Sequence, residues 1–293
     1  MIKYVLYHTN FVITLRRIYT MKKFDGILIG TDLDGTLLNS NKIITKENIE
    51  AIEYFKSEGG YFTFITGRMP SYVSYIYDTT NPNCPFGCIN GGGLYDHITR
   101  EYVWTERLPD SVVELLDFVD THAPSVGIQV STYDKVYFCK ENEVMAHFRA
   151  VTGVPNLVRH YNDINEPFAK ILFSVLNTDD IPKLAALLDS HPMADNFSFL
   201  HSEKYLYEII PKGMHKGVAL LNLTKILNID PKRTIAIGDY NNDIEMIKTA
   251  GIGVAVSNAC DDLKEVADYI TVSNNEHAIA AVINDLDNGK LRI

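Results

Sequence analysis

The 293-residue sequence predicts an α/β protein with a parallel sheet and an inserted α+β domain. Apolar runs rich in branched residues recur along the chain, and each ends in Gly, Asp, Asn or Thr before a helical pattern begins. This order is typical of βα units. Between Arg107 and Ile210 it gives way to a different alternation of strand-like and helical segments, and it resumes afterwards. The runs on both sides therefore predict one sheet, with a second domain inserted into it.

The predicted core strands are the apolar runs themselves. They cover residues 26–31, 61–66, 86–90, 234–238 and 253–256. Periodic apolar segments predict helices over residues 45–57, 215–227 and 243–250. In an open parallel sheet the carboxyl ends of the strands face the ligand crevice. Polar residues that follow these runs are therefore candidates for a functional site.

The inserted segment, residues 107–210, has the size of an ordinary domain. Helical patterns at 111–122, 141–151 and 180–190 alternate there with strand-like runs at 127–139, 168–176 and 197–210. The insertion divides the core into residues 21–106 and 211–293. Residues 1–20 are predicted to be an extension outside the fold, because a charged lead followed by a buried strand begins at Met21.

The composition narrows the functional classes. The formal net charge of −10 predicts a surface that repels nucleic acid and anionic membranes. The sequence shows no membrane-spanning run and no signal-peptide cleavage site. The four cysteines form no CxxC pair, which argues against a structural zinc site and favours reduced thiols in a cytoplasmic protein.

Two carboxylates, Asp32 and Asp34, follow the first core strand in the segment DLDGT. Two such groups a few ångströms apart repel unless they share a proton or a cation. Mg²⁺ binds carboxylate, carbonyl and water oxygens, and commonly those of a substrate phosphate as well. The pair therefore indicates a metal and a phosphoryl group together, with one carboxylate attacking phosphorus and the other carrying the proton. The alternative is that both are turn and cap residues.

A second carboxylate group follows the strand at 234–238, in the segment GDYNND. Asp239 comes directly after that strand and would be a metal ligand from a second strand end. Asn242 and Asp243 would complete the shell or hold its water molecules. The alternative is that Asp243 is a helix N-cap and Asp239 a turn residue.

A lysine, Lys216, lies in the first turn of the predicted helix 215–227. The helix macrodipole favours anions at that end, so a bound anion explains a cation there. Lys212 and His215 are nearby alternatives.

The loop after the run 61–66 offers a second phosphate-binding element. Thr66 brings a hydroxyl, and Gly67 lets exposed backbone N–H groups approach phosphoryl oxygens. Arg68 could contact the substrate or pair with an acid elsewhere. A buried threonine beside a surface arginine is the other interpretation.

The motifs DLDGTLL, ITGR, PKGMHKG and GDYNND, in this order, resemble those of the haloacid dehalogenase-like superfamily. The insertion between the second and third motif resembles the C2-type cap of its Cof-type, type IIB sugar-phosphatase branch. The resemblance covers nearly all of the chain after Met21. It implies a Rossmann-like core with helices on both faces. It also implies a Mg²⁺-dependent phosphatase that acts on small phosphorylated metabolites, sugar phosphates in particular, through an aspartyl-phosphate.

The resemblance implies a role for each candidate residue. Asp32 is the nucleophile, and Asp34 is the general acid/base. Thr66 and Lys216 bind the phosphoryl group, with Lys216 counted among the catalytic residues, and Asn90 and Gly91 match a loop near the substrate. Gly67 and Arg68 join the substrate-binding candidates through the loop argument above. The metal is held by Asp32, the backbone carbonyl of Asp34 and Asp239, with Asn242 and Asp243 supporting that shell.

Two alternatives are a sugar phosphomutase with the same core and a non-catalytic regulator, which is a different class. In a sugar phosphomutase, the phosphoryl group of the aspartyl-phosphate passes to a sugar hydroxyl. A non-catalytic regulator would bind a phosphometabolite without turnover. A phosphate-accepting receiver module is disfavoured by the insertion and by the spacing of the two aspartates. The expected partner is a small phosphorylated metabolite and neither nucleic acid nor membrane, with a monomer or weak homo-oligomer as the assembly. The cap is expected to set specificity, and Lys170 is one residue that could reach the substrate.

Overall fold

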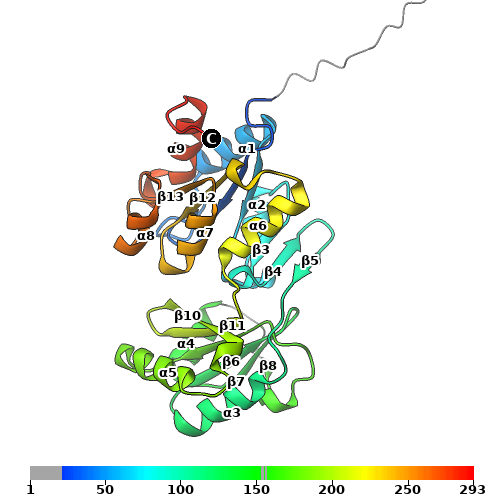
Figure 1. The fold of residues 1–293 in the computed structure, drawn as a ribbon, viewed down its shortest axis with the longest axis vertical. Coiled ribbons are helices and arrows are strands. Elements are labelled where there is room, and N and C mark those ends of the chain that lie inside the picture. The colour runs from blue at the N-terminus through cyan, green and yellow to red at the C-terminus, as the bar shows by residue number, and fades with distance from the viewer. Residues whose placement is uncertain (1–21, 153–154, 156) are drawn as a thin grey trace, which may run out of the picture.

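The computed structural model describes residues 22–152, 155 and 157–293, and the predicted extension at residues 1–20 lies outside them. Figure 1 shows two lobes joined by two stretches of chain. The upper lobe contains both the first and the last described residues. This arrangement is the expected one for a domain inserted into a core.

Five parallel strands form the central sheet of the upper lobe. Their order is β14 (Tyr269–Ile270), β13 (Ile252–Ala255), β12 (Thr234–Gly238), β1 (Leu28–Thr31) and β2 (Tyr61–Phe64). All residues of β1, β12 and β13 are buried, as expected for strands covered on both faces. The predicted α/β class is thus confirmed.

Two pairs of helices cover this sheet. Helix α1 (Lys46–Ser57) packs on α9 (Ala278–Asp287), and α6 (Lys216–Leu227) packs on α7 (Ile244–Thr249). Right-handed crossovers place α1 and α7 on opposite faces, because β1 to β2 and β12 to β13 run in opposite directions across the sheet. The shorter helices α2 (Ser74–Thr80) and α8 (Asp261–Val266) complete the lobe.

The predicted core strand at residues 86–90 differs from the expectation. It is the short strand β3 (Phe86–Cys88), and it pairs along its length with β4 (Gly93–Asp96), which pairs with β5 (Glu101–Thr105). It meets the central sheet through a parallel bridge between Ile65 and Gly87. The strand ends early because the chain turns there into a 3₁₀ segment, η2 (Ile89–Gly91), with left-handed backbone at Asn90.

The lower lobe holds an antiparallel-rich sheet of six strands. Their order is β10 (Phe197–Glu203), β11 (Leu206–Pro211), β9 (Lys170–Ser174), β6 (Gly127–Ser131), β7 (Val136–Lys140) and β8 (Leu157–Val158). The predicted runs 127–139 and 197–210 are each a pair of strands. Among its described residues, this lobe has the helices α3 (Val112–His122), α4 (Glu143–Thr152) and α5 (Ile181–Asp189).

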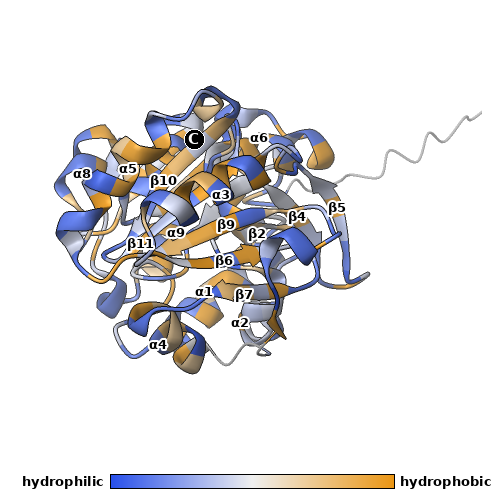
Figure 2. Cartoon of the chain, turned by 90° about the horizontal axis from the view of Figure 1, so that it is seen from below, coloured by the Kyte–Doolittle hydropathy of each residue, from blue (hydrophilic) through white to orange (hydrophobic). Residues whose placement is uncertain are grey.

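Two apolar clusters organise the lobes. One face of the six-stranded sheet packs on α3 and α5 in a cluster of its own, and strand β9 is largely orange in Figure 2 because its centre is Ile-Leu-Phe. Four residues of the lower lobe belong instead to the cluster of the upper lobe: Val136, Phe138, Met145 and Ala169. The second lobe is therefore seated on the first by shared packing.

Among the described helices, none is long and apolar enough to cross a bilayer. Cys84, Cys88, Cys139 and Cys260 are free thiols.

Candidate active site

Three neighbouring strands of the central sheet end at one edge and carry the site. Strands β12, β1 and β2 are parallel and adjacent, with Thr31 in register with Ile237 and Phe64. Asp32 follows β1 directly and Asp239 follows β12 directly. Because the carboxyl ends of parallel strands share an edge, residues from distant parts of the chain meet there.

An acidic cluster lies at this edge. Asp32, Asp239 and Asp243 each offer a carboxylate oxygen, and these oxygens lie within 4.8 Å of one another. Asp243 is fully buried and Asp32 nearly so. Oxygen ligands of this kind suit a hard divalent cation. The structure thus brings together three of the predicted metal ligands.

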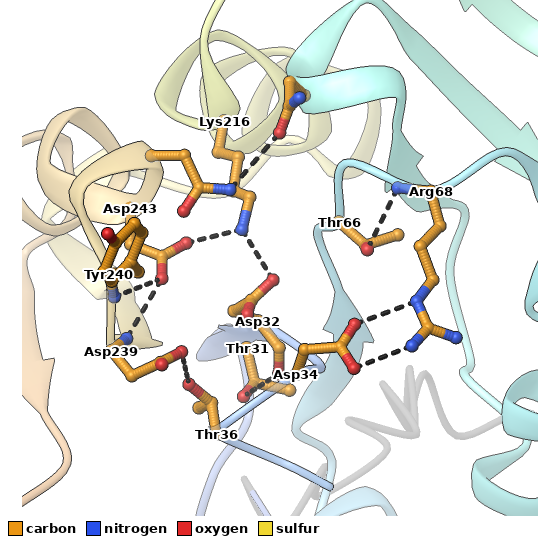
Figure 3. Close-up of polar contacts among 12 residues, drawn as sticks. Thr31, Asp32, Asp34, Thr36, Thr66, Arg68, Lys216, Asp239, Tyr240 and Asp243 are labelled. Atoms are coloured by element: carbon orange, nitrogen blue, oxygen red, sulfur yellow. Dashed lines mark hydrogen bonds and ion pairs between the residues drawn. The ribbon is translucent and has the colours of Figure 1, made fainter. Parts of the chain in front are cut away.

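Lys216 is the cation of the cluster. It opens helix α6, and its side chain is 1% exposed. Its Nζ donates to Oδ1 of Asp32 at 2.5 Å and to Oδ1 of Asp243 at 2.6 Å (Figure 3). Burial alone would lower the pKa of Lys216, but Asp243 and Asp32 hold that pKa above its usual value. The lysine is therefore charged throughout the physiological range.

The charges of this cluster do not balance among themselves. Three carboxylates face one ammonium, which leaves two negative charges in a buried place. Burial raises the pKa of Asp32 well above its ordinary value against the effect of Lys216, and the other two carboxylates add to the rise. Burial and Asp243 raise the pKa of Asp239 to about 6. A divalent cation matches the missing charge, so the donor set fits Mg²⁺.

The loops around the cluster fix its geometry. Oδ2 of Asp243 accepts the backbone N–H groups of Asp239 at 3.0 Å and Tyr240 at 3.2 Å. The Thr36 hydroxyl donates to Oδ1 of Asp239 at 2.8 Å. Gly35 has a φ of +80°, and a Cβ there would lie 2.3 Å from Oδ2 of Asp239. Only glycine therefore fits between the first strand's loop and this carboxylate.

Asp34 points away from the cluster (Figure 3). Arg68 donates to both of its oxygens, from Nε at 2.8 Å and from the terminal nitrogen at 2.7 Å. Lys42 donates to Oδ1 at 2.7 Å. Burial would raise the pKa of Asp34, but the two cations hold it below its usual value. The structure thus separates the two aspartates of DLDGT into different electrostatic environments.

The remaining candidates lie in the loops where the two lobes make contact. The Thr66 hydroxyl accepts the backbone N–H of Arg68 at 3.2 Å, and the Gly67 carbonyl accepts from Lys170 of the lower lobe. Nδ2 of Asn242 donates to Oδ1 of Asn90 at 3.4 Å. Gly91 approaches the backbone of His215, next to Lys216. All the predicted site residues therefore lie in one neighbourhood.

Comparison with known proteins agrees with this geometry. The sequence model of the haloacid dehalogenase-like hydrolases matches residues 29–283. The chain belongs to this family. The predicted family is confirmed, and the match spans both lobes of this haloacid dehalogenase-like hydrolase.

Relatives of the hydrolase are similar over most of their length. The 5-amino-6-(5-phospho-D-ribitylamino)uracil phosphatase YitU of Bacillus subtilis (strain 168) is 29% identical over 266 residues, which cover 88% of this chain and 96% of YitU. The solved structure of a haloacid dehalogenase-like hydrolase from Bacteroides thetaiotaomicron has a TM-score of 0.76 at 27% identity. The similarity covers 89% of this chain and 99% of that protein's chain. The HAD subclass IIB sugar phosphatase BT4131 shares the fold at a TM-score of 0.77 and 22% identity, with coverage of 89% and 99%. The predicted enzyme class, a phosphoric monoester hydrolase, is confirmed by the family match and the phosphatase relatives.

Sequence reasoning missed two charged residues near the site of this hydrolase. Lys42 lies in a surface loop, where nothing separates it from an ordinary exposed lysine. Glu208 did carry a signal, because it is a lone acid inside the apolar run LYEIIP. A buried acid of this kind needs a partner, and Lys170 supplies one.

Proposed function

We propose that this protein is a Mg²⁺-dependent phosphatase that hydrolyses small phosphorylated metabolites, sugar phosphates in particular, through an aspartyl-phosphate on Asp32. One observation carries the proposal. Asp32 is held by Lys216 in a buried cluster that lacks two positive charges, while Asp34 lies outside that cluster with a pKa set by other groups. Two carboxylates in different environments suit two different roles.

The two aspartates divide the reaction between them. An oxygen of Asp32 attacks phosphorus, and the bond from phosphorus to the leaving oxygen breaks. Asp34 gives a proton to that oxygen and then takes one from the attacking water, which releases inorganic phosphate and restores Asp32. The lowered pKa of Asp34 favours its base form before substrate binds. Arg68 and Lys42 both lower the pKa of Asp34, and contact of Arg68 with the substrate would weaken its effect and favour the acid form.

The other residues bind and orient. Mg²⁺ would be held by Asp32, Asp239 and the Asp34 carbonyl, supported by Asn242 and Asp243, and it would neutralise charge on the phosphoryl oxygens. Thr66, Gly67 and Lys216 would hold those oxygens. Arg68, Asn90 and Gly91 would contact the rest of the substrate.

The lower lobe, residues 107–210 by this proposal, is the cap that selects the substrate. YitU is named for an action on a phosphorylated ribityl compound. A phosphate on a polyol or sugar chain is therefore the first class to test. Such a chain offers hydroxyl groups, which the charged side chains of the cap can recognise by hydrogen bonds.

The test is release of inorganic phosphate from 5-amino-6-(5-phospho-D-ribitylamino)uracil, a set of sugar phosphates, nucleotides and an aryl phosphate. Each is assayed with Mg²⁺, with a chelator and with Asp32→Asn, and the exposed Asp262→Asn serves as the control. We expect release that needs both Mg²⁺ and Asp32. Transfer of phosphate between sugars in place of release would indicate a mutase. Binding of phosphate esters without any turnover, in folded protein with Mg²⁺ bound, would contradict the proposal.

A further inference from the structure

A buried ion pair of the lower lobe lies against the site. Nζ of Lys170 on β9 lies 3.0 Å from Oε2 of Glu208 on β11, and the two residues are 8% and 4% exposed. Burying two charges costs desolvation, so such a pair is weak evidence for a stabilising role. The position of this ion pair between the lobes suggests a functional role instead.

Both members of the pair reach across to the upper lobe. Lys170 Nζ donates to the Gly67 carbonyl at 3.1 Å. Nδ2 of Asn90 donates to Oε2 of Glu208 at 2.9 Å, and Asn90 is 1% exposed. The pair therefore contacts two loops that contain proposed substrate-binding residues.

The loop that carries Asn90 is strained. Ile89, Asn90 and Gly91 follow one another with φ values of 55°, 50° and 97°. This region is unfavourable for a β-branched residue, and such strain persists only where surrounding contacts enforce it. The backbone N–H groups of Ile89 and Asn90 donate to the carbonyls of Arg68 and Thr66, both at 3.1 Å. A Cβ on Gly91 would lie 2.1 Å from the His215 carbonyl oxygen.

From Asn90 the contacts continue to the acidic cluster. Its Oδ1 accepts from Asn242 at 3.4 Å. Asn242 belongs to the 3₁₀ segment η7 (Asn241–Asp243), and Asp243 in that segment holds Lys216. A path of polar contacts thus leads from Glu208 through Asn90 to the segment beside the proposed nucleophile.

We propose that Glu208, oriented by Lys170, is a positioning residue that fixes the Asn90 amide when the cap is seated on the core. The site then has its working geometry only with the cap in place, because the strained loop depends on a contact from the other lobe. The inference rests on the proposed phosphatase function. Glu208 itself does not take part in the bond changes.

Two double variants isolate the contact. Lys170→Met/Glu208→Gln and Lys170→Met/Glu208→Leu both remove the ion pair, so neither leaves a buried charge without its partner. The glutamine keeps an oxygen that can accept from Asn90, and the leucine does not. The two variants therefore differ in one hydrogen bond between the lobes.

Rates and loop exchange are measured on both variants and the wild type. We expect the kcat of the leucine variant to lie about tenfold or more below that of the glutamine variant, since small errors of positioning are costly in catalysis. KM and Tm should differ little between the two. Hydrogen exchange at the backbone amides of residues 89–91, with Mg²⁺ and inorganic phosphate present, should be faster in the leucine variant.

The outcomes separate this inference from the proposed function. A wild type that releases no phosphate contradicts the function, and the exchange measurement still decides the inference. Equal kcat values in the two variants overturn the positioning role, as do equal exchange rates in residues 89–91. Parallel losses of kcat and Tm in both variants would show a structural role for the pair and would also overturn the inference.

Discussion

Nζ of Lys216 lies 2.5 Å from Oδ1 of Asp32, in a place where water has almost no access to either side chain. This contact favours the ionised carboxylate and opposes the effect of burial, which still raises the pKa of Asp32 well above its ordinary value. The same ammonium would face the oxygens of a phosphoryl group that approaches Asp32. One lysine can therefore prepare the nucleophile and stabilise charge on the group under attack.

Replacement of Lys216 by methionine tests this role. We expect Lys216→Met to lower kcat by roughly 10²-fold or more, because preorganised charge at a reacting centre is worth several kcal/mol. Inhibition by inorganic phosphate should weaken as well. The exposed neighbour variant Lys212→Met is the control and should keep the wild-type rate. A normal rate in Lys216→Met would transfer the phosphate-binding role to Lys212 or His215.

The Asp34→Asn variant separates proton transfer from metal binding. Its backbone carbonyl remains, so Mg²⁺ affinity should change little, while kcat for substrates with poor leaving groups should fall about 10²-fold or more. An aryl phosphate with an acidic leaving group should be affected less. Mg²⁺ binding is measured by calorimetry and kcat by phosphate release. Equal loss of affinity and rate would contradict the role assigned to Asp34.

Much of the site could be predicted because it follows from the ends of strands. The run 234–238 coincides with β12, and the residue after it is Asp239 of the acidic cluster. What could not be predicted depends on pairing between distant segments. The sequence of residues 86–90 resembles that of a core strand, yet β3 pairs with β4 instead of joining the central sheet along its length. The composition of a strand does not determine which strand it pairs with. The contact of Glu208 with Asn90 joins two lobes, and no local pattern encodes the partner across such an interface.

Stability should depend on Mg²⁺ and pH together. The pKa of Asp239 is raised to about 6 in the folded protein. At pH values below the pKa of Asp239 in the unfolded chain, protonated Asp239 therefore adds to the stability of the metal-free fold. This stabilisation is lost as the pH rises through about 6. Mg²⁺ replaces the lost proton, so the rise in Tm from chelator to excess Mg²⁺ should grow by a few degrees between about pH 5 and about pH 7.

The variant Asp239→Asn removes one of the carboxyl groups with a raised pKa and should weaken this dependence, whereas Asp262→Asn should preserve it. A wild-type Mg²⁺ effect that is the same at both ends of the pH range would show that Asp239 does not exchange a proton for the metal. Differential scanning fluorimetry with chelator and with Mg²⁺ provides the measurement.

Arg68 and Lys42 lower the pKa of Asp34, and the pH dependence of kcat/KM should show this effect. Both cations favour the carboxylate and lower its pKa, so Arg68→Met should raise it. The limb of the pH profile of kcat/KM that belongs to Asp34 should then move to higher pH, and Lys42→Met should move it less because Lys42 makes one contact to the carboxylate and Arg68 makes two. Lys46→Met, at an exposed lysine of α1, is the control that should leave the profile in place. An unmoved limb in Arg68→Met would mean that another group produces it.

Gly35 and Gly289 offer a matched pair for the geometry of the metal site. Both have positive φ, +80° and +71°, so alanine is strained at either position. A Cβ at Gly35 would lie 2.3 Å from Oδ2 of Asp239, whereas a Cβ at Gly289 meets no atom within 4 Å. Backbone strain alone should lower Tm by a few degrees in both variants.

Only Gly35→Ala should also displace Asp239, so we expect this variant to bind Mg²⁺ at least tenfold more weakly than the wild type. Gly289→Ala should bind Mg²⁺ as the wild type does. Equal Mg²⁺ affinity in the two variants would mean that the position of Asp239 does not matter for the metal, which would remove this carboxylate from the proposed ligand set.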